Sequence, residues 1–352
     1  MSNLPFALVL LTAPALALPQ TPTATPVSVV VATSPMPASV FTSSAPMSFR
    51  IEADFERLRD DRGQESPYRE ARFFLNAPDG AVLELPLEVK TRGNFRLKEC
   101  RFPPLRLNFP KTAIVGTPFE GQDKYKLVTH CENDGEHEQN VLEEYLIYRA
   151  YNLITDRSFL VRLARIDYVD TSGDEDPLTR WAFLMEEDDA LAARLGGRLV
   201  EPPAIPPHVV SAEHDGRISL FQYMVGNTDF SIYFLHNVKV VQMPDGEVVP
   251  VPYDFDWSGI VNADYATPDA SLGTRSVRER VYRGLCRPEL DYAALYGLFA
   301  ERRAAIETLY RSQTQLGDRE REQALDYLAE FYDTIDDRNK ARERIQEECR
   351  NT

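Results

Sequence analysis

The chain has 352 residues, which suggests one large domain or two smaller ones, and 43% of the residues are hydrophobic, enough for a substantial core. Its net charge is −16 and its pI is about 4.9. This acidity argues against a nucleic-acid-binding surface, which needs a concentration of positive charge. We therefore expect no nucleic-acid partner.

The N-terminus resembles a secretory signal peptide. No charged residue precedes Arg50, Leu4 to Leu18 is a short apolar run, and Ala15-Leu16-Ala17 offers a small-x-small cleavage site. The run is too short and too interrupted by proline for a membrane span. We predict a signal peptide over residues 1–18, a Pro/Thr/Ser-rich disordered linker over residues 19–47, and no transmembrane anchor in the mature chain. The alternative is an uncleaved, disordered leader on a cytoplasmic protein.

Four cysteines are consistent with export, because an even count outside the cytosol permits two disulfides. Three connectivities are possible. We favour Cys100–Cys131 and Cys286–Cys349, since each pair lies within one half of the chain. A zinc site is disfavoured because no C-x-x-C spacing occurs.

The first half of the chain is predicted to be rich in strands and the second half in helices. Apolar alternation bounded by turn residues predicts strands at 48–61, 68–75, 82–91, 102–109, 124–129, 162–170 and 179–185. Helical periodicity predicts helices at 140–154, 188–195, 218–225, 277–284, 290–310 and 320–349. This order predicts an α+β fold for residues 48–352, with a strand-rich N-lobe (about 48–200) and a helical C-lobe (about 201–352).

The most informative stretch runs from Val225 to Gly259. Two β-rich runs, 237–243 and 248–253, flank Pro244-Asp245-Gly246-Glu247, which is a strong hairpin signal. Polar residues cluster just before the first run and just after the second. Because the strands of a hairpin are antiparallel, these groups should meet at its open end. Carboxylate and amide oxygens gathered in this way suit a hard cation such as Mg²⁺.

Several motifs together resemble the CotH kinase family of secreted and spore-coat proteins. They are RGN at Arg92 to Asn94 followed by KECRFPPLRLNF, LVTHCEND before a helix, WAFLMEEDDALAARLG, GNTDF…HN, and VPYDFDWSG. The resemblance covers roughly Glu84 to Gly259. It implies a two-lobed protein-kinase-like fold and Mg²⁺- (or Mn²⁺-) and ATP-dependent phosphotransfer to protein Ser/Thr hydroxyls. The partner would be a protein substrate or cell-envelope component in a secreted, periplasmic or cell-envelope setting.

Carried over residue by residue, the resemblance also implies roles. Asp229 would be the catalytic residue that orients or deprotonates the acceptor hydroxyl. The metal ligands would be Asn237, Asp254 and Asp256. The nucleotide-binding residues would be Arg92, Gly93, Asn94, Arg106, Lys126 and Glu143, with Lys126 paired to Glu143 or Glu144 across strand and helix.

Two departures from the family pattern leave alternatives open. Asn237 follows Asp229 at a longer spacing than in protein kinases, and Pro103-Pro104 stands where the family has a lysine pair. A catalytically degenerate binding or envelope-structure module is therefore the second hypothesis. A carboxylate-based hydrolase using Asp229 with Asp254 or Asp256 is the third. Each motif also has a structural explanation, such as a tight turn at Arg92-Gly93-Asn94 that needs glycine.

Overall fold

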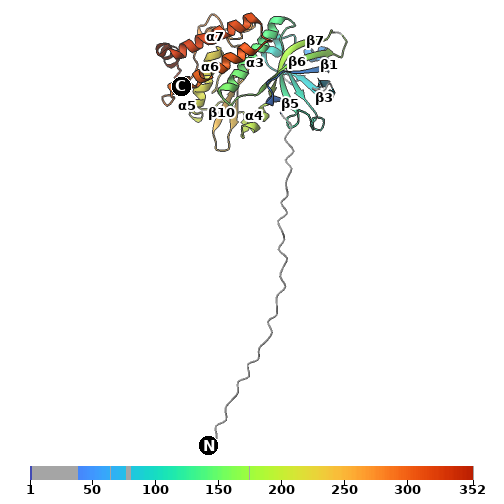
Figure 1. Ribbon diagram of the computed structural model, residues 1–352, viewed down its shortest axis with the longest axis horizontal. Coiled ribbons are helices and arrows are strands. Elements are labelled where there is room, and N and C mark those ends of the chain that lie inside the picture. The colour runs from blue at the N-terminus through green and yellow to red at the C-terminus, as the bar shows by residue number, and fades with distance from the viewer. Residues whose placement is uncertain (2–38, 64, 77–80, 174, 352) are drawn as a thin grey trace. The chain divides into compact units, whose positions relative to one another are not determined.

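The first half of the molecule consists mainly of strands in which buried and more exposed side chains alternate. Strand β1 (Met47–Ala53) buries Met47, Phe49, Ile51 and Ala53 and leaves the residues between them more exposed, the period of two expected of a strand with one face in a core. In the computed structural model, the described residues are 1, 39–63, 65–76, 81–173 and 175–351. The described residues from 39 onward belong to one compact unit (Figure 1).

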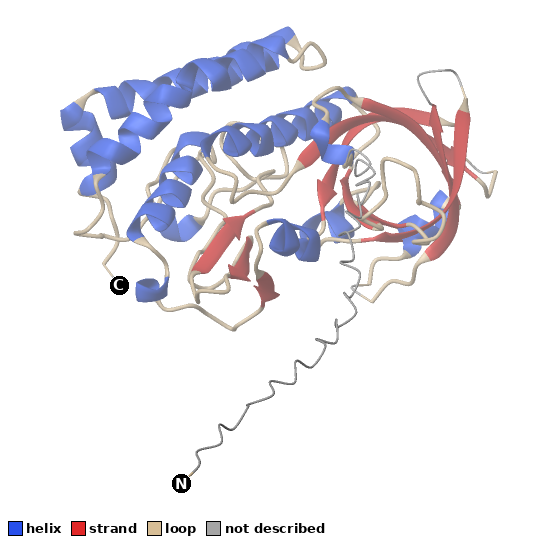
Figure 2. Cartoon of the chain, turned by 60° about the horizontal axis from the view of Figure 1, so that its bottom comes forward, coloured by secondary structure: helices blue, strands red, loops and turns tan. Residues whose placement is uncertain are grey.

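Seven strands close into a barrel in the order β1-β2-β3-β4-β5-β7-β6. Strand β1 pairs antiparallel with β2 on one side and parallel with β6 on the other, so neither strand is left as an edge. Figure 2 shows the curved strands forming a ring at one side of the molecule. The other barrel strands are β2 (Arg69–Asn76), β3 (Val82–Thr91), β4 (Leu105–Asn108), β5 (Lys124–Val128), β6 (Val161–Asp170) and β7 (Leu178–Glu186).

Side chains fill the barrel interior. Phe73 packs edge-on against Phe109 and Phe119 with ring centroids 5.2 Å away in each case, and Tyr125 lies 5.6 Å from Phe119. These rings belong to a buried cluster supplied by the inward faces of all seven strands. The described part of the barrel interior is therefore a packed core.

The outward faces of β5, β6 and β7 begin a second core. Val128, Leu163 and Phe183 point away from the barrel and pack with helix α3 (Gly135–Ile154) in a separate buried cluster. Helix α3 starts at Asp134, whose carboxylate accepts a hydrogen bond from the His137 backbone. It is buried nearly all round, because the barrel covers one side and the C-terminal helices cover the other.

The remaining elements complete this second layer around α3. Strands β9 (Val238–Gln242) and β10 (Val248–Pro252) form the hairpin, and β8 (Arg198–Val200) joins β9 to make a three-stranded sheet. The longer helices are α5 (Ala212–Val225), α6 (Tyr292–Ser312) and α7 (Asp318–Asp336). The shorter helices are α1 (Phe55–Asp60), α2 (Phe95–Glu99), α4 (Asp188–Arg194) and α8 (Arg338–Ala341), and a π-helical turn spans Arg342–Gln346. Single 3₁₀ turns occur at Val40–Thr42, Pro207–Val209 and Ala270–Leu272.

The predicted fold class was wrong. The chain contains a closed mixed barrel followed by a helical region, whereas we expected a two-lobed kinase-like fold with a strand-rich N-lobe and a helical C-lobe. The cause is the parallel pairing of β1 with β6, for example Phe49 opposite Ile166. Such a contact joins residues more than a hundred positions apart, and local alternation does not reveal it.

Three local expectations also need correction. No helix spans 277–284; this segment is held in irregular form by side chains, with the Arg280 guanidinium 3.5 Å from the centre of the Tyr327 ring. The helix predicted over 320–349 ends at Asp336, because Asp337 caps a new short helix with its carboxylate. The strand expected at 48–61 stops at Ala53, and Asp54 caps α1.

Both expected disulfides are formed, Cys100–Cys131 and Cys286–Cys349, which confirms the favoured connectivity. Disulfides are typical of proteins that fold outside the reducing cytosol. Among the described residues, no helix has the length and apolarity that crossing a bilayer requires. The predicted signal peptide, apart from Met1, and most of the predicted linker lie outside the described residues, while folded structure begins before the predicted boundary at Ser48, with buried Val40.

Candidate functional site

The hairpin gathers polar groups at its open end, as its sequence predicts. Val238 pairs with Pro252 as the last register pair, and the Tyr253 backbone N–H then donates to the Asn237 carbonyl at 3.0 Å. Asn237 and Asp254 therefore flank the end of the ladder. Both have positive φ, 52° and 64°, a left-handed conformation that is uncommon for residues other than glycine. Strained backbone of this kind clusters at functional sites.

Asp229 is fixed against the first strand of the hairpin. The Asn237 side-chain Nδ2 donates to both the Asp229 carbonyl, at 2.8 Å, and the Asp229 Oδ2 atom, at 2.9 Å. His236 Nε2 lies 2.7 Å from Asp229 Oδ1. The carboxylate is thus held on both oxygens while its side chain stays 37% exposed. This combination of fixed orientation and access is what a general base or a ligand-binding group requires.

A buried arginine occupies the centre of the site. Arg96, on α2, lies 3.3 Å from Asp256 Oδ2, 3.2 Å from Glu144 Oε2 on α3, and 3.6 Å from Asp254 Oδ1. Arg96, Glu144 and Asp256 are all buried, whereas the Asp254 side chain is 44% exposed. Because no isolated charge can be buried cheaply, the three form one mutually dependent ionic cluster.

The pKa values follow from this burial. Burial, only partly offset by Arg96, raises the pKa of Glu144 to about 8. Burial also raises the pKa of Asp256 to about 6, with Arg96 opposing the shift and the carboxylates of Asp254 and Asp229 adding to it. Burial works against the charge on Arg96, but its acidic neighbours outweigh that cost and raise its pKa. The cluster therefore carries more acid than its single cation neutralises.

Several features of the chain place Arg96. Gly93 has φ of 105°, a conformation that favours glycine, and it turns the chain from β3 into α2. The disulfide at Cys100 anchors the end of α2, and the Arg62 side chain donates to the carbonyls of Leu97 and Cys100 at 2.8 and 2.6 Å. Asn94 occupies the N-cap position without accepting a capping hydrogen bond.

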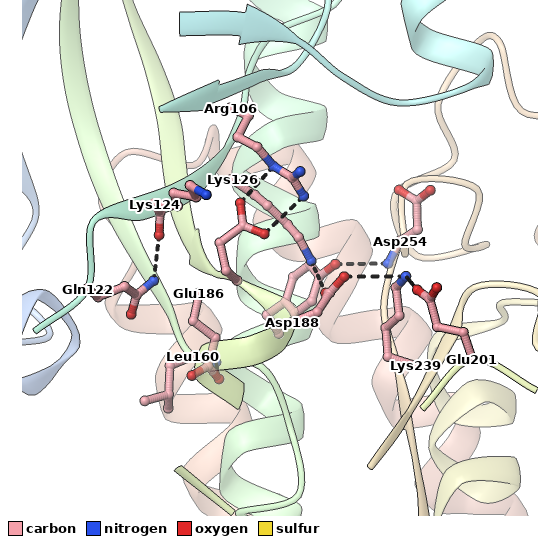
Figure 3. A network of polar contacts seen from close by, with 12 residues as sticks. Arg106, Gln122, Lys124, Lys126, Leu160, Glu186, Asp188, Glu201, Lys239 and Asp254 are labelled. Carbon is pink, nitrogen blue, oxygen red and sulfur yellow. Dashed lines mark hydrogen bonds and ion pairs between the residues drawn. The ribbon is translucent and has the colours of Figure 1, made fainter. Parts of the chain in front are cut away.

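A second ionic network lies on the outer face of β4 and β5 (Figure 3). Lys126 and Lys239 both point at Asp188, the latter at 3.3 Å, and Arg106 pairs with Glu187 at 2.8 Å. Lys126 is almost fully buried, and burial lowers its pKa despite the opposing effect of Asp188. Tyr253, the residue before Asp254, lies within 6 Å of both lysine ammonium groups. The network therefore extends up to the open end of the hairpin.

The predicted pairing of Lys126 with Glu143 or Glu144 was wrong. Lys126 pairs with Asp188, Glu144 pairs with Arg96, and Glu143 points to the opposite side of α3. Adjacent helical residues are separated by about 100° around the axis, so two neighbouring glutamates cannot face the same partner. Arg92 lies close enough to Lys126 for its positive charge to help lower the pKa of Lys126.

Two residues of the site were not correctly predicted from the sequence. Arg96 was missed, and Glu144 was offered as a partner for Lys126 instead of Arg96. Arg96 follows the RGN motif by two positions, but it sits among the exposed residues Phe95 and Lys98, and nothing local predicts its burial. The apolar periodicity of α3 places Glu144 on the same face as Tyr148, whose hydroxyl accepts a hydrogen bond from the Asp254 backbone at 2.8 Å. That periodicity was the available signal for separating Glu144 from Glu143.

A cavity of about 410 Å³ adjoins Asp229. Its lining includes Asp229, His236, Trp257, Asp269 and Arg283. The rings of Trp257 and Phe95 meet edge to face at 5.2 Å, which continues an aromatic surface from the cavity toward α2. Its size suits a small molecule or a side chain of a larger partner.

The oxygen atoms at the open end of the hairpin are of the chemical type that binds Mg²⁺. Asp254 and Asp256 supply carboxylates, and the Asn237 amide keeps its Oδ1 because its Nδ2 serves Asp229. Arg96 already pairs with both carboxylates, and among the described residues no group of three or more His, Cys, Asp or Glu side chains is arranged to hold a metal ion. An ion at this site would therefore share Asp254 and Asp256 with Arg96.

The sequence matches no protein-family model, and a search of curated proteins finds no match.

Proposed function

We propose that the chain is an exported phosphotransferase that uses ATP and Mg²⁺ or Mn²⁺ to modify hydroxyl groups of a protein or cell-envelope component. One observation carries this proposal: Asp229, Asn237 and Asp254 converge at the open end of one hairpin, with Asn237 bonded to Asp229 and adjacent to Asp254. These are the residues that the CotH resemblance singles out. The proposal rests on their chemistry, since the fold is not the kinase-like one that the resemblance implied.

In this proposal Asp229 accepts the proton of the acceptor hydroxyl. His236 and Asn237 hold its carboxylate, so one lone pair is presented toward the adjoining cavity in a fixed direction. Asp254, Asp256 and Asn237 would hold the metal ion, which supplies positive charge to phosphate oxygens. Arg92 and Lys126 are the strand-side cations that support binding of the donor phosphates.

The export part of the proposal has separate support. Two disulfides favour an oxidising compartment, which is compatible with secretion, the periplasm or the cell envelope. If the chain is expressed without the predicted signal peptide, it should remain in the cytosol, where its cysteines stay reduced. The mature chain for the assays below is therefore best prepared under oxidising conditions.

The test is incubation of the mature chain with radiolabelled ATP and either Mg²⁺ or Mn²⁺. We expect label on the protein itself or on an added hydroxyl-bearing substrate, and we expect Asp229→Asn and Asp254→Asn to abolish it. Asp245→Asn is the matched control, because Asp245 lies in the turn at the other end of the same hairpin. Labelling that survives Asp229→Asn would reject the proposed role of Asp229, and no labelling of the wild type would reject catalysis.

A specific observation favours a second candidate, a binding module without turnover. Arg96 pairs with both carboxylates that would hold the metal, and Asp188 neutralises Lys126. If these pairs persist, neither group is released for a nucleotide. A thermal-shift titration separates the candidates, since a ligand that binds only the native state raises its melting temperature. A shift with a cell-surface polymer and none with ATP and Mg²⁺ would favour the binding module.

A further inference from the structure

A second cavity lies on the side of α3 that faces away from Arg96. It has a volume of about 350 Å³. Its lining includes Asn140 and Glu143 from α3, Arg278 from the irregular segment before α6, and Arg319 and Glu320 from α7. None of these residues takes part in the hairpin site. The two neighbouring glutamates of α3 face different sides of the helix: Glu144 pairs with Arg96, and Glu143 lines this cavity.

Two buried polar groups in this cavity have no partner. Glu143 is 5% exposed, and among the described residues its carboxylate makes no hydrogen bond or ion pair. Asn140 is 8% exposed, and its Nδ2 likewise has no hydrogen-bond acceptor within the described chain. Leaving such groups unsatisfied costs stability, and native proteins rarely do so without a functional reason.

The other polar side chains of the cavity are already engaged or lie at its rim. Gln139 Oε1 accepts from the Gly317 backbone at 2.7 Å. The Arg278 guanidinium stacks 4.8 Å from the centre of the Tyr327 ring and donates to the Gly259 carbonyl at 3.4 Å. Arg319 is exposed. The floor therefore presents one acceptor, the Glu143 carboxylate, and one donor, the Asn140 amide.

We propose that this cavity binds a small primary amine that also carries a hydrogen-bond acceptor. The ammonium group donates to the Glu143 carboxylate, and the acceptor atom receives the Asn140 Nδ2–H. A cation suits the site because its lining carries three carboxylates, Glu136, Glu143 and Glu320, against two guanidinium groups, Arg278 and Arg319. Among the described residues the cavity's acids form no cluster of three fit for a metal ion, which favours an organic cation.

Binding should depend on pH. Burial and the charge of Glu320 raise the pKa of Glu143, while Arg278 opposes the shift. Glu143 is in turn among the groups that raise the pKa of buried Tyr310, on α6, so that ring also faces it. The exposed rim adds Glu136 and Arg319, which carry opposite charges. An ammonium group binds the ionised carboxylate, so the affinity should rise as the pH rises.

The test uses ethanolamine as the probe on the mature, disulfide-intact chain. Titration calorimetry should show saturable binding, and scanning fluorimetry should show a concentration-dependent rise in melting temperature. Ethylene glycol, which is similar in size but uncharged, should give neither. Glu143→Gln should weaken ethanolamine binding at least tenfold, and Glu322→Gln, an exposed change on α7, should leave it unchanged. Equal binding of the two probes, or full binding by Glu143→Gln, would overturn the proposal.

Two further measurements keep the outcome clear if a variant folds poorly. Glu143→Gln without ligand should melt at a higher temperature than the wild type at pH 8, because it removes a buried, unpaired carboxylate; a lower melting temperature would show a structural partner and reject the site. Asn140→Ala should weaken ethanolamine but not ethylamine, which lacks the acceptor. An equal loss for both amines would reject the assigned role of Asn140.

Discussion

The Nε atom of Arg96 lies 3.3 Å from the Oδ2 atom of Asp256, and this pair ties α2, at the barrel, to the segment that follows the hairpin. Glu144 on α3 completes the contact from a third element. The candidate site is therefore built where three parts of the chain meet, and its charges are also part of what holds those parts together.

Replacing Arg96 with Ala should strongly destabilise the protein. The change leaves Glu144 and Asp256 buried without their cation, and breaking a buried pair on one side typically costs about 3–5 kcal/mol. Urea unfolding at pH 8 measures the loss. Arg57→Ala serves as the control, because the Arg57 side chain is 70% exposed in its pair with Asp54 and such pairs contribute about 1 kcal/mol or less. Similar losses in the two variants would contradict the central place of Arg96.

The stability of the wild type should depend on Glu144 between about pH 4.5 and pH 8. The folded pKa of Glu144, about 8, lies above its ordinary value of 4.5, so the folded state binds the proton more tightly than the unfolded state does. The corresponding stability is fully present below pH 4.5 and is lost as the pH rises through 8. The Glu144→Gln side chain stays neutral at every pH. Over this window the free energy of unfolding of the variant should therefore fall by up to about 1.4 kcal/mol less per pH unit than that of the wild type. Parallel pH profiles for the two proteins would show that Glu144 titrates normally.

Local structure was predictable where the sequence signal is local. The predicted run 82–91 matches β3. The two strands of the hairpin and helix α4 also lie within a few residues of their predicted bounds. The open end of the hairpin brings Asn237 and Asp254 together as expected, because antiparallel pairing alone requires it.

Non-local structure was not predictable in the same way. Closure of the barrel depends on β1 lying beside β6, and the site depends on Arg96 reaching Glu144 and Asp256. Alternation and helical periodicity show which face of an element is buried, but they do not show against what it is buried. The motif resemblance found the carboxylates and missed the arginine between them.

Asn237 should tolerate glycine better than alanine. Its φ of 52° is a conformation in which a Cβ atom costs about 1–2 kcal/mol, and its side chain also donates two hydrogen bonds to Asp229. Both substitutions remove the hydrogen bonds, but only glycine relieves the backbone. Asn237→Ala should therefore be less stable than Asn237→Gly by about 1 kcal/mol in chemical denaturation. The reverse order would mean that the left-handed conformation is not maintained.

Replacing Asp188 should destabilise the protein more than replacing its ion-pair partner Lys126. In Lys126→Met, Asp188 keeps Lys239 as a partner at 3.3 Å, and the apolar side chain replaces an ammonium group that lies 4.7 Å from the centre of the Phe159 ring. In Asp188→Ala, the almost fully buried Lys126 loses its only carboxylate ion-pair partner among the described residues. We expect the second variant to lose roughly 2 kcal/mol more than the first, since an unpaired buried charge is the costlier product. Thermal unfolding at pH 7 measures the difference, and equal losses would argue against this pairing.

Removing the second disulfide should release the C-terminal segment selectively. Besides Cys286–Cys349, two backbone hydrogen bonds of 2.9 Å hold this segment, one from Cys286 to the Arg350 carbonyl and one from Arg350 to the Gly284 carbonyl. Replacing both cysteines with Ser should cost about 2–5 kcal/mol, as is typical for a native disulfide. Because Arg342 and Arg344 are exposed and lie just before the lost cross-link, trypsin should cut the variant first at one of them, and mass spectrometry of the early fragments locates the cut. First cleavage within the barrel would instead show that this disulfide stabilises the whole molecule.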